Sequence, residues 1–104
     1  MRYQLVFQFR GDTLADYDKM IALEDLLIEV LAGSEDEVDG HDVGSDETNI
    51  FIWTSSPSEA FLRCRSVLES VGHLQSATVA FREADGERYR VIWPPGSARE
   101  FRVL

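Results

Sequence analysis

The segment Asn49-Ile-Phe-Ile-Trp-Thr-Ser55 restricts the fold more than any other feature of this 104-residue chain. Its apolar residues are β-branched or aromatic, which favours a β-strand. Since the side chains of a strand alternate between its two faces, Ile50 and Ile52 face one way, and Phe51 and Trp53 face the other. A strand that is apolar on both faces belongs in the middle of a sheet. The segment therefore predicts a central strand.

Four further segments predict strands: residues 3–9, 38–43, 77–83 and 88–93. The first places Tyr3, Leu5, Phe7 and Phe9 on one face and Gln4, Val6 and Gln8 on the other, as a strand with one strongly buried face does. The second is polar and rich in Asp and Gly, which suits an edge strand, where charge discourages unwanted pairing. The last two are separated by Asp85-Gly86, a dipeptide typical of a two-residue hairpin turn.

Two segments have the 3.6-residue periodicity of amphipathic helices. The first runs from a cap at Asp12 or Thr13, with Asp16 in its first turn, to about Ala32. The second begins with Ser56-Pro57-Ser58-Glu59, which predicts a capping box with proline in its preferred first position. Gly33 and Gly72 follow the two helices as expected of C-terminal caps. The predicted apolar stripes include Leu14, Tyr17, Met20, Ile21, Leu27, Ile28 and Leu31 in the first helix, and Ala60, Phe61, Cys64, Val67, Leu68 and Val71 in the second.

The order of these elements, β, α, ββ, α, ββ, predicts an α+β fold in a single domain over residues 1–104. Two helices that each bury one stripe pack on one face of an antiparallel sheet. The right-handed crossover rule then favours a ferredoxin-like βαββαβ arrangement with spatial strand order 4-1-3-2. The last segment adds an extra C-terminal hairpin strand to this core.

Charge divides the chain sharply. Residues 11–60 carry fourteen acidic residues and one basic residue, Lys19, within a formal net charge of −9. A surface of one sign steers association toward the opposite sign, so we expect an acidic docking surface for a basic protein partner. Nucleic acid is not an expected partner, because phosphate binding needs clustered Lys and Arg. The residues predicted to form this surface are Glu35, Asp36, Glu37, Asp39, His41, Asp42, Asp46 and Glu47.

His41, in Asp39-Gly40-His41-Asp42, is the main candidate for catalysis, since a histidine beside carboxylates can act as a general base or a metal ligand. Strand alternation places Asp39 and His41 on one face and Asp42 on the other, so at most two groups from the strand converge. The calcium-loop spacing is also absent. We therefore expect His41 to hydrogen-bond locally within the Asp39–Gly44 turn, with no catalytic residue, no metal and no cofactor.

Cys64, the single cysteine, excludes an intramolecular disulfide and a thiolate-rich zinc site. It falls on the apolar stripe of the second helix, so a buried structural thiol is expected. His73, just past that helix, is expected to complement the negative end of its dipole.

No apolar run approaches the roughly 18 residues of a membrane span. The alternating N-terminus also lacks the continuous apolar stretch of a signal peptide. These features predict a cytoplasmic protein without a membrane partner.

The stretch Asp39-Gly40-His41-Asp42-Val43-Gly44, followed by Asn49-Ile50-Phe51-Ile52-x-Thr54 and the Pro57 helix, resembles a group of small uncharacterised bacterial α+β proteins. The resemblance covers about the middle third of the chain. It implies a compact α+β domain and carries no established activity, so no catalytic residue is transferred from it.

The face of the sheet that two helices leave uncovered predicts an association surface. The apolar residues Phe51, Trp53, Tyr89 and Trp93 are expected on it, and an uncovered apolar patch usually marks a contact. We therefore expect a homodimer through this face.

The leading functional hypothesis is a non-enzymatic cytoplasmic binding or regulatory protein that docks a basic protein. An immunity-type inhibitor of a nuclease toxin is its most concrete form, because a nuclease offers a basic cleft that an acidic surface can fill. Two alternatives stay open: a small-ligand-binding regulatory domain, and a cofactor-free enzyme with His41 as acid or base. Fold alone does not separate these three.

Overall fold

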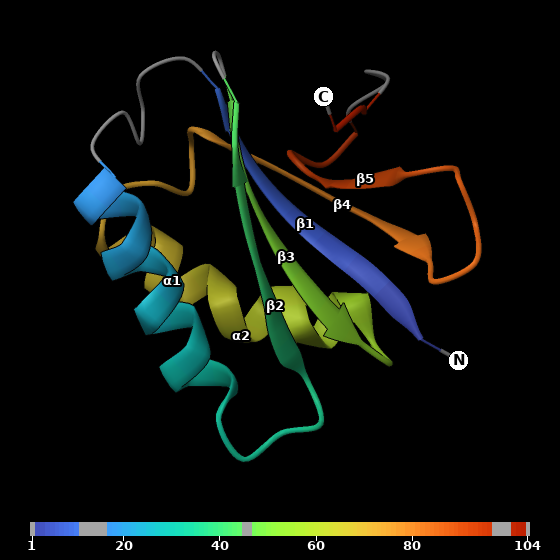
Figure 1. Cartoon of the computed structure of the whole chain (residues 1–104), viewed down its shortest axis with the longest axis horizontal. Helices are drawn as coiled ribbons and strands as arrows, with labels where there is room; N and C mark the ends of the chain where they lie inside the picture. The colour runs from blue at the N-terminus through green and yellow to red at the C-terminus, as the bar shows by residue number, and fades with distance from the viewer. Residues whose placement is uncertain (1, 11–16, 45–46, 97–100, 104) are drawn as a thin grey trace.

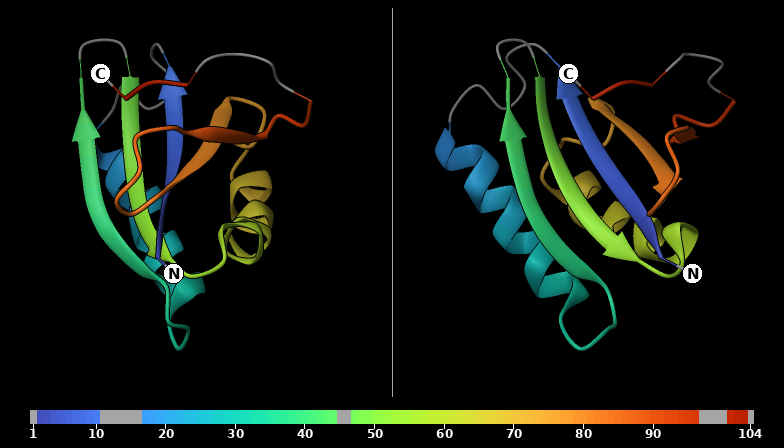
Figure 2. Two further views of the ribbon diagram at one scale, coloured as in Figure 1. Left: turned by 90° about the vertical axis from the view of Figure 1, so that its right-hand side faces the viewer. Right: turned by 45° about the vertical axis from the view of Figure 1, so that its right-hand side comes forward.

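The computed structural model describes residues 2–10, 17–44, 47–96 and 101–103. Both helices lie on the same side of one sheet (Figures 1 and 2), and the predicted α+β class is confirmed. Neither described helix is long and apolar enough to span a bilayer. The described elements are β1 (Tyr3–Arg10), α1 (Tyr17–Leu31), β2 (Glu37–Val43), β3 (Glu47–Thr54), α2 (Pro57–Ser70), β4 (Ala77–Glu83) and β5 (Arg90–Trp93).

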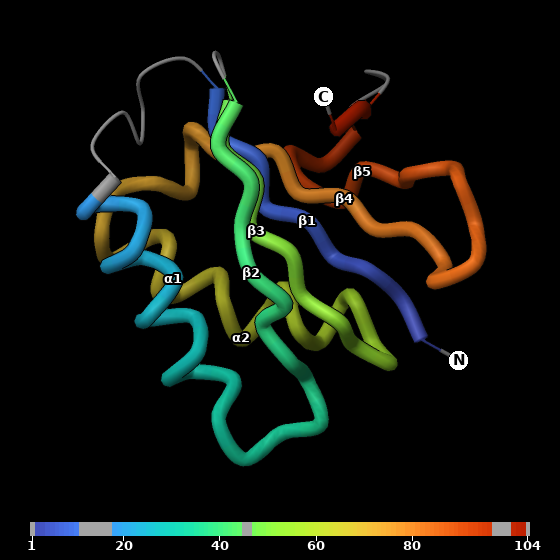
Figure 3. Tube along the Cα trace, in the orientation of Figure 1, coloured from blue at the N-terminus to red at the C-terminus, as the bar shows by residue number. Residues whose placement is uncertain are grey.

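The five strands form one sheet in the order β2-β3-β1-β4-β5, and every pair of neighbours is antiparallel. The chain trace in Figure 3 follows this order across the molecule. The strand predicted to be central, β3, is an inner strand, and its Ile50 and Ile52 are fully buried. The acidic strand β2 lies at one edge, where its polar side chains reach solvent.

The main core lies between the sheet and the two helices. Leu5, Phe7 and Phe9 of β1 point toward the helices and are at most 1% exposed. They pack against Met20, Leu23, Leu27 and Leu31 of α1 and against Ala60, Phe61, Cys64 and Leu68 of α2. Each large apolar side chain buried here stabilises the fold by about 1.5–3 kcal/mol. The predicted stripes were too wide at two positions, because Ile28 is 49% exposed and Val71 is 41% exposed.

The helix ends agree only in part with the predicted caps. Gly33 and Gly72 adopt φ values of +83° and +78°, as glycines after a helix do. Ser56 precedes Pro57 as predicted, but its side chain makes no capping hydrogen bond, so the predicted capping box is wrong. The backbone N–H of Ser56 instead donates to Thr54 Oγ1 at 3.0 Å. The predicted N-terminal cap of α1 and the positions Leu14 and Asp16 lie outside the described residues.

The connection between β4 and β5 is longer than the predicted two-residue turn. Gly86 N donates to Glu83 O at 2.9 Å, but β5 begins only at Arg90. The Nη1 atom of Arg82 donates to the carbonyl oxygens of Glu83, Ala84 and Gly86 at 3.0, 2.8 and 3.3 Å. Because these carbonyl oxygens are bound to Arg82, they do not pair with the returning strand.

The face of the sheet away from the helices carries a second, smaller apolar cluster. Phe101 is only 7% exposed and packs with Val6 and Ala80, its ring centroid 5.0 Å from that of Tyr89. Residues 101–103 cross this face near the end of β1 and the start of β3 (Figure 2, left). The chain's own C-terminal segment therefore covers part of the face that the sequence left open.

The four residues predicted to form a dimer face do not lie together. Phe51 and Tyr89 pack in the covered cluster, and Trp53 is half-buried with the Arg2 guanidinium 5.3 Å from its ring centroid. Trp93 lies on the helix side, where its Nε1 donates to Leu74 O at 3.0 Å. A register shift explains this, because Val91 is opposite Ala80 whereas Trp93 is opposite Val79. The predicted placement of Trp93 on the uncovered face is wrong.

Candidate functional site

Carboxylates line both α1 and β2, which lie side by side at one edge of the molecule (Figure 1). Residues 17–43 contain nine acidic residues and one basic residue, Lys19. Because the helix and the strand are adjacent, the negative potentials of their carboxylates add. The exposed members are called the acidic edge from here on: Asp18, Asp25, Glu29, Glu35, Glu37, Asp39 and Asp42.

A β-bulge shapes the acidic edge along β2. Pairing with β3 shifts between Val38 and Gly40, which leaves Asp39 without a cross-strand partner. Gly40 adopts φ of +117°, a conformation that glycine reaches without the steric cost of a side chain. A bulge and charged side chains both discourage another strand from pairing with an edge. They leave the carboxylates of Asp39 and Asp42 exposed to solvent.

Four of the predicted docking residues have the exposure that a docking surface requires: Glu35, Glu37, Asp39 and Asp42. Glu37 accepts from Arg2 Nη2 at 3.3 Å, and both side chains are more than half exposed. Exposed pairs of this kind contribute about 0–1 kcal/mol, so a partner can compete for Glu37. Asp46 lies outside the described residues.

Asp36 differs from these carboxylates, because its side chain is only 7% exposed. Its Oδ2 accepts from Arg63 Nη1 of α2 at 3.4 Å, and its backbone N–H donates to Ser34 Oγ at 3.1 Å. Asp36 therefore connects the start of β2 to α2. Its predicted place on an exposed docking surface is wrong, since an ion pair holds it inward.

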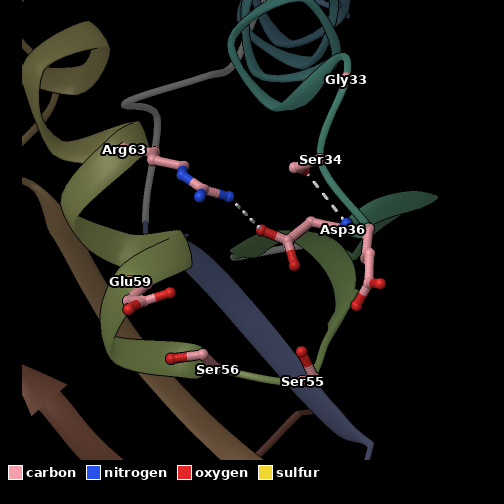
Figure 4. Close-up of a pocket in the computed structure, with 8 residues that line it drawn as sticks. Gly33, Ser34, Asp36, Ser55, Ser56, Glu59 and Arg63 are labelled. Atoms are coloured by element: carbon pink, nitrogen blue, oxygen red, sulfur yellow. Dashed lines mark hydrogen bonds and ion pairs between the residues drawn. The ribbon is translucent and has the colours of Figure 1, made fainter.

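Asp36 and Arg63 also line a polar pocket of about 310 Å³ between the end of α1 and the start of α2 (Figure 4). The other lining residues are Gly33, Ser34, Glu35, Ser55, Ser56 and Glu59. Activation of a serine hydroxyl as a nucleophile needs an adjacent general base. Among the described residues, the lining contains no histidine, the Asp36 carboxylate is engaged by Arg63, and no lining serine hydroxyl hydrogen-bonds to Glu35 or Glu59. The pocket thus has hydrogen-bonding groups without an assembled nucleophile.

Glu47 is also buried, at 6% exposure, and does not lie on the acidic edge. Its Oε2 accepts from Gln8 Nε2 at 3.2 Å and from Asn49 Nδ2 at 2.9 Å. Gln8 Nε2 also lies 3.1 Å from Asn49 Oδ1 and 2.8 Å from Arg102 O. The prediction of an exposed Glu47 is wrong because this polar network encloses it. The only sequence signal for the network is the polar side chains on one face of two inner strands.

His41 joins β2 to α1. Its Nδ1 lies 2.9 Å from Glu24 Oε2, and the two side chains are 26% and 12% exposed. The predicted local hydrogen bonding within the Asp39–Gly44 turn is therefore incomplete, because a partner from another element was missed. His41 is opposite Ile50, whose side chain packs in the core, so the imidazole faces the helix side of the sheet. No pattern in the sequence identifies Glu24 as the partner of His41.

The described residues contain no group of three or more His, Cys, Asp or Glu side chains placed to hold a metal ion. His73, predicted to complement the helix dipole, lies with its ring centroid 6.2 Å from that of Phe9. Cys64 is fully buried. Burial, aided by the negative charge of Asp36 and opposed by Arg63, raises the pKa of the Cys64 thiol from 9.0 to about 12. A thiol that stays protonated is a poor nucleophile.

Comparison of the chain with protein-family models, with curated proteins and with solved structures finds no match.

Proposed function

We propose that the protein is a non-enzymatic cytoplasmic binding protein whose acidic edge docks a basic protein partner. One observation carries the proposal: α1 and the edge strand β2 lie side by side and, with the segment that joins them, carry seven exposed carboxylates. Lys19 is the only Lys or Arg within residues 17–43. A partner with a basic surface gains attraction along the whole edge, and charge complementarity of this kind accelerates association and selects the partner.

The shape of the acidic edge favours docking by side chains. The bulge at Asp39 and the carboxylates along β2 oppose strand addition. A basic surface that packs across α1 and β2 keeps the sheet unchanged and meets carboxylates from both elements. An inhibitor of a nucleic-acid-binding toxin is the most concrete form of this function, since such a toxin carries a basic cleft.

We also propose a ferredoxin-like arrangement for the domain. Read from β4, the strands run β4-β1-β3-β2, with β5 added beside β4. The fold fixes the acidic edge, because β2 lies at the end of the sheet and α1 packs beside it. The fold itself supports no particular activity.

The alternative of a cofactor-free enzyme has weaker support. It requires His41 to meet a substrate, but this side chain is about three-quarters buried and is bonded to Glu24. His41 therefore fits a connecting role between β2 and α1 better than a catalytic one.

Charge reversal tests the docking proposal. The variant D25K/D39K/D42K changes three exposed positions, so its fold is expected to remain intact. The matched control, R88E/R90E, changes exposed residues at the other edge of the sheet. Each form is used as bait in the lysate of the native host, and the captured basic protein is then purified for binding measurements.

We expect the acidic-edge variant to slow association at least tenfold and R88E/R90E to bind like the unmodified protein. Raising the salt from about 0.05 to about 0.5 M should weaken binding to the unmodified protein strongly, because exposed charges are screened. Normal binding by D25K/D39K/D42K together with loss of binding in R88E/R90E would contradict the proposal, because the edge with Arg88 and Arg90 would then be the docking surface.

A further inference from the structure

A second candidate site lies at the opposite edge of the sheet from the acidic edge. A groove of about 760 Å³ runs between the β3–α2 junction, residues 55–58, and the end of β4 with its connection to β5. Sites for small organic ligands have volumes of about 300–1,000 Å³. Three arginines line the groove, Arg82, Arg88 and Arg90, against two acidic residues, Glu83 and Glu87.

Arg82 holds the wall of the groove in place. Its guanidinium binds the carbonyl oxygen of Glu83 at the end of β4 and those of Ala84 and Gly86 in the connection, and it lies 5.9 Å from the centroid of the Tyr89 ring. The Tyr89 hydroxyl in turn donates to Gln4 Oε1 of β1 at 3.0 Å. These contacts fix the connection to the sheet. The Nη1 and Nε atoms of Arg82 are thereby engaged within the protein, Nε by the Tyr89 hydroxyl at 3.4 Å.

Arg88 and Arg90 differ from Arg82. Both are exposed, and within the described residues neither side chain makes a hydrogen bond or an ion pair. Arg90 is opposite Phe81 in the sheet, so the two side chains share a face. Phe81 packs edge-to-face with Tyr3, their ring centroids 5.7 Å apart. The groove therefore combines two unpaired guanidinium groups with an aromatic pair.

We propose that this groove binds a small organic anion. One phosphate or carboxylate group is held by Arg88 and Arg90, because the planar guanidinium matches both groups in a bidentate geometry. An aromatic or apolar body rests against Tyr3 and Phe81. Ser56 and Ser58, which also line the groove, supply hydroxyl donors, and the Ser56 hydroxyl makes no capping bond.

Glu83 and Glu87 limit the charge of the ligand. Their carboxylates repel a polyanion such as nucleic acid, which needs many basic contacts along its backbone. A ligand with a single anionic group avoids this repulsion by binding to the arginines alone. The site shares no residue with the acidic edge, so this proposal goes beyond partner docking.

Amide NMR titration of the full chain with phenyl phosphate tests the proposal. We expect saturable shifts at Ser56, Ser58 and residues 86–90, and a dissociation constant near about 1 mM or below. The variant R88Q/R90Q should bind phenyl phosphate at least tenfold more weakly, while its amide NMR spectrum should remain that of a folded protein. The matched control is R65Q, because Arg65 lies 4.7 Å over the Trp93 ring and does not line the groove.

Three outcomes would overturn the proposal. The first is unchanged affinity in R88Q/R90Q, or an equal loss in R65Q. The second is that inorganic phosphate binds as tightly as phenyl phosphate, which would show that Tyr3 and Phe81 do not contribute to binding. The third is the lack of a saturable shift at about 10 mM phenyl phosphate. The binding of a basic partner by the acidic-edge variant is a separate measurement, so its result does not change the interpretation of these three outcomes.

Discussion

Glu47 and Asp36 belong to the same acidic run as Asp39 and Asp42, yet their surroundings give them different roles. A carboxylate removed from water needs hydrogen-bond donors to offset its lost hydration. Glu47 has donors from Gln8 and Asn49, and Asp36 has Arg63. Asp39 and Asp42 keep their hydration and can exchange it for a basic partner. Burial therefore divides one acidic sequence into residues with a structural role and exposed residues that are free for the proposed docking.

Cys64 gives a prediction at the same scale. Its thiol should not react with the disulfide reagent DTNB at about pH 8 in the folded protein, because the thiolate is the reactive form and a pKa of about 12 keeps it protonated. The unfolded chain should react fully. Rapid reaction of the folded protein would contradict the inert, buried role assigned to this residue.

The raised pKa of Cys64 also predicts a pH dependence of stability. The pKa of the Cys64 thiol is about 12 in the folded protein and near 9.0 in the unfolded chain. The contribution of the protonated thiol to the free energy of unfolding is therefore complete below pH 9 and declines as the pH rises above 9. C64A lacks this ionisation and serves as the control. Between about pH 8 and about pH 10.5, the unmodified protein should lose more unfolding free energy than C64A. Equal losses in the two proteins would contradict the shift.

At the scale of elements, β2 depends on its neighbours for its position. An edge strand has one hydrogen-bonded partner strand, here β3, and its pairing is interrupted by the bulge near Asp39. The contact between His41 and Glu24 attaches β2 to α1 from the helix side. The acidic edge thus rests on a side-chain link between its two elements.

A double-mutant cycle tests the link between His41 and Glu24. H41N and E24A should show a coupling of about 0.5–1.5 kcal/mol in urea unfolding, since one variant removes the imidazole and the other the carboxylate of the same hydrogen bond. The control cycle, H41N with D39N, should show coupling below about 0.3 kcal/mol. H41N should retain docking of a basic partner. A coupling near zero in the first cycle would mean that this contact does not stabilise β2.

At the scale of the whole molecule, alternation and periodicity predicted the strands and helices because each segment buries a single consistent set of apolar side chains. Leu5, Phe7 and Phe9 show this for β1. The inner position of β3 was also predictable, since only an inner strand can bury apolar residues on both faces. These predictions depend on local pattern and on the rules of sheet packing.

The rest depends on contacts between distant parts of the chain, which a single sequence does not display. The pairs Glu24 with His41, Asp36 with Arg63 and Gln8 with Glu47 bring together residues 17, 27 and 39 positions apart. Trp93 was misplaced because one register shift moves a side chain to the other face. The groove at β4–β5 likewise depends on the path of a loop that Arg82 holds.

The packing of Phe101 on the face of the sheet away from the helices was also not predicted, and it affects the expected self-association. The segment 101–103 covers Val6, Ala80 and Tyr89, the centre of the face on which a homodimer was expected. Because those side chains are occupied within one chain, a second copy can reach them only after the segment leaves. We therefore expect F101A to lose about 3 kcal/mol of unfolding free energy through lost packing.

The same substitution should increase self-association, because it uncovers an apolar patch on the sheet. Sedimentation velocity at high micromolar concentration should show more dimer or higher species for F101A, and for a chain that lacks residues 101–104, than for the unmodified protein. L62S is the matched control, since Leu62 is 61% exposed on α2 and its replacement uncovers no new surface. An unmodified protein that is dimeric and dissociates upon F101A would contradict the covering role, because Phe101 would then belong to the interface itself.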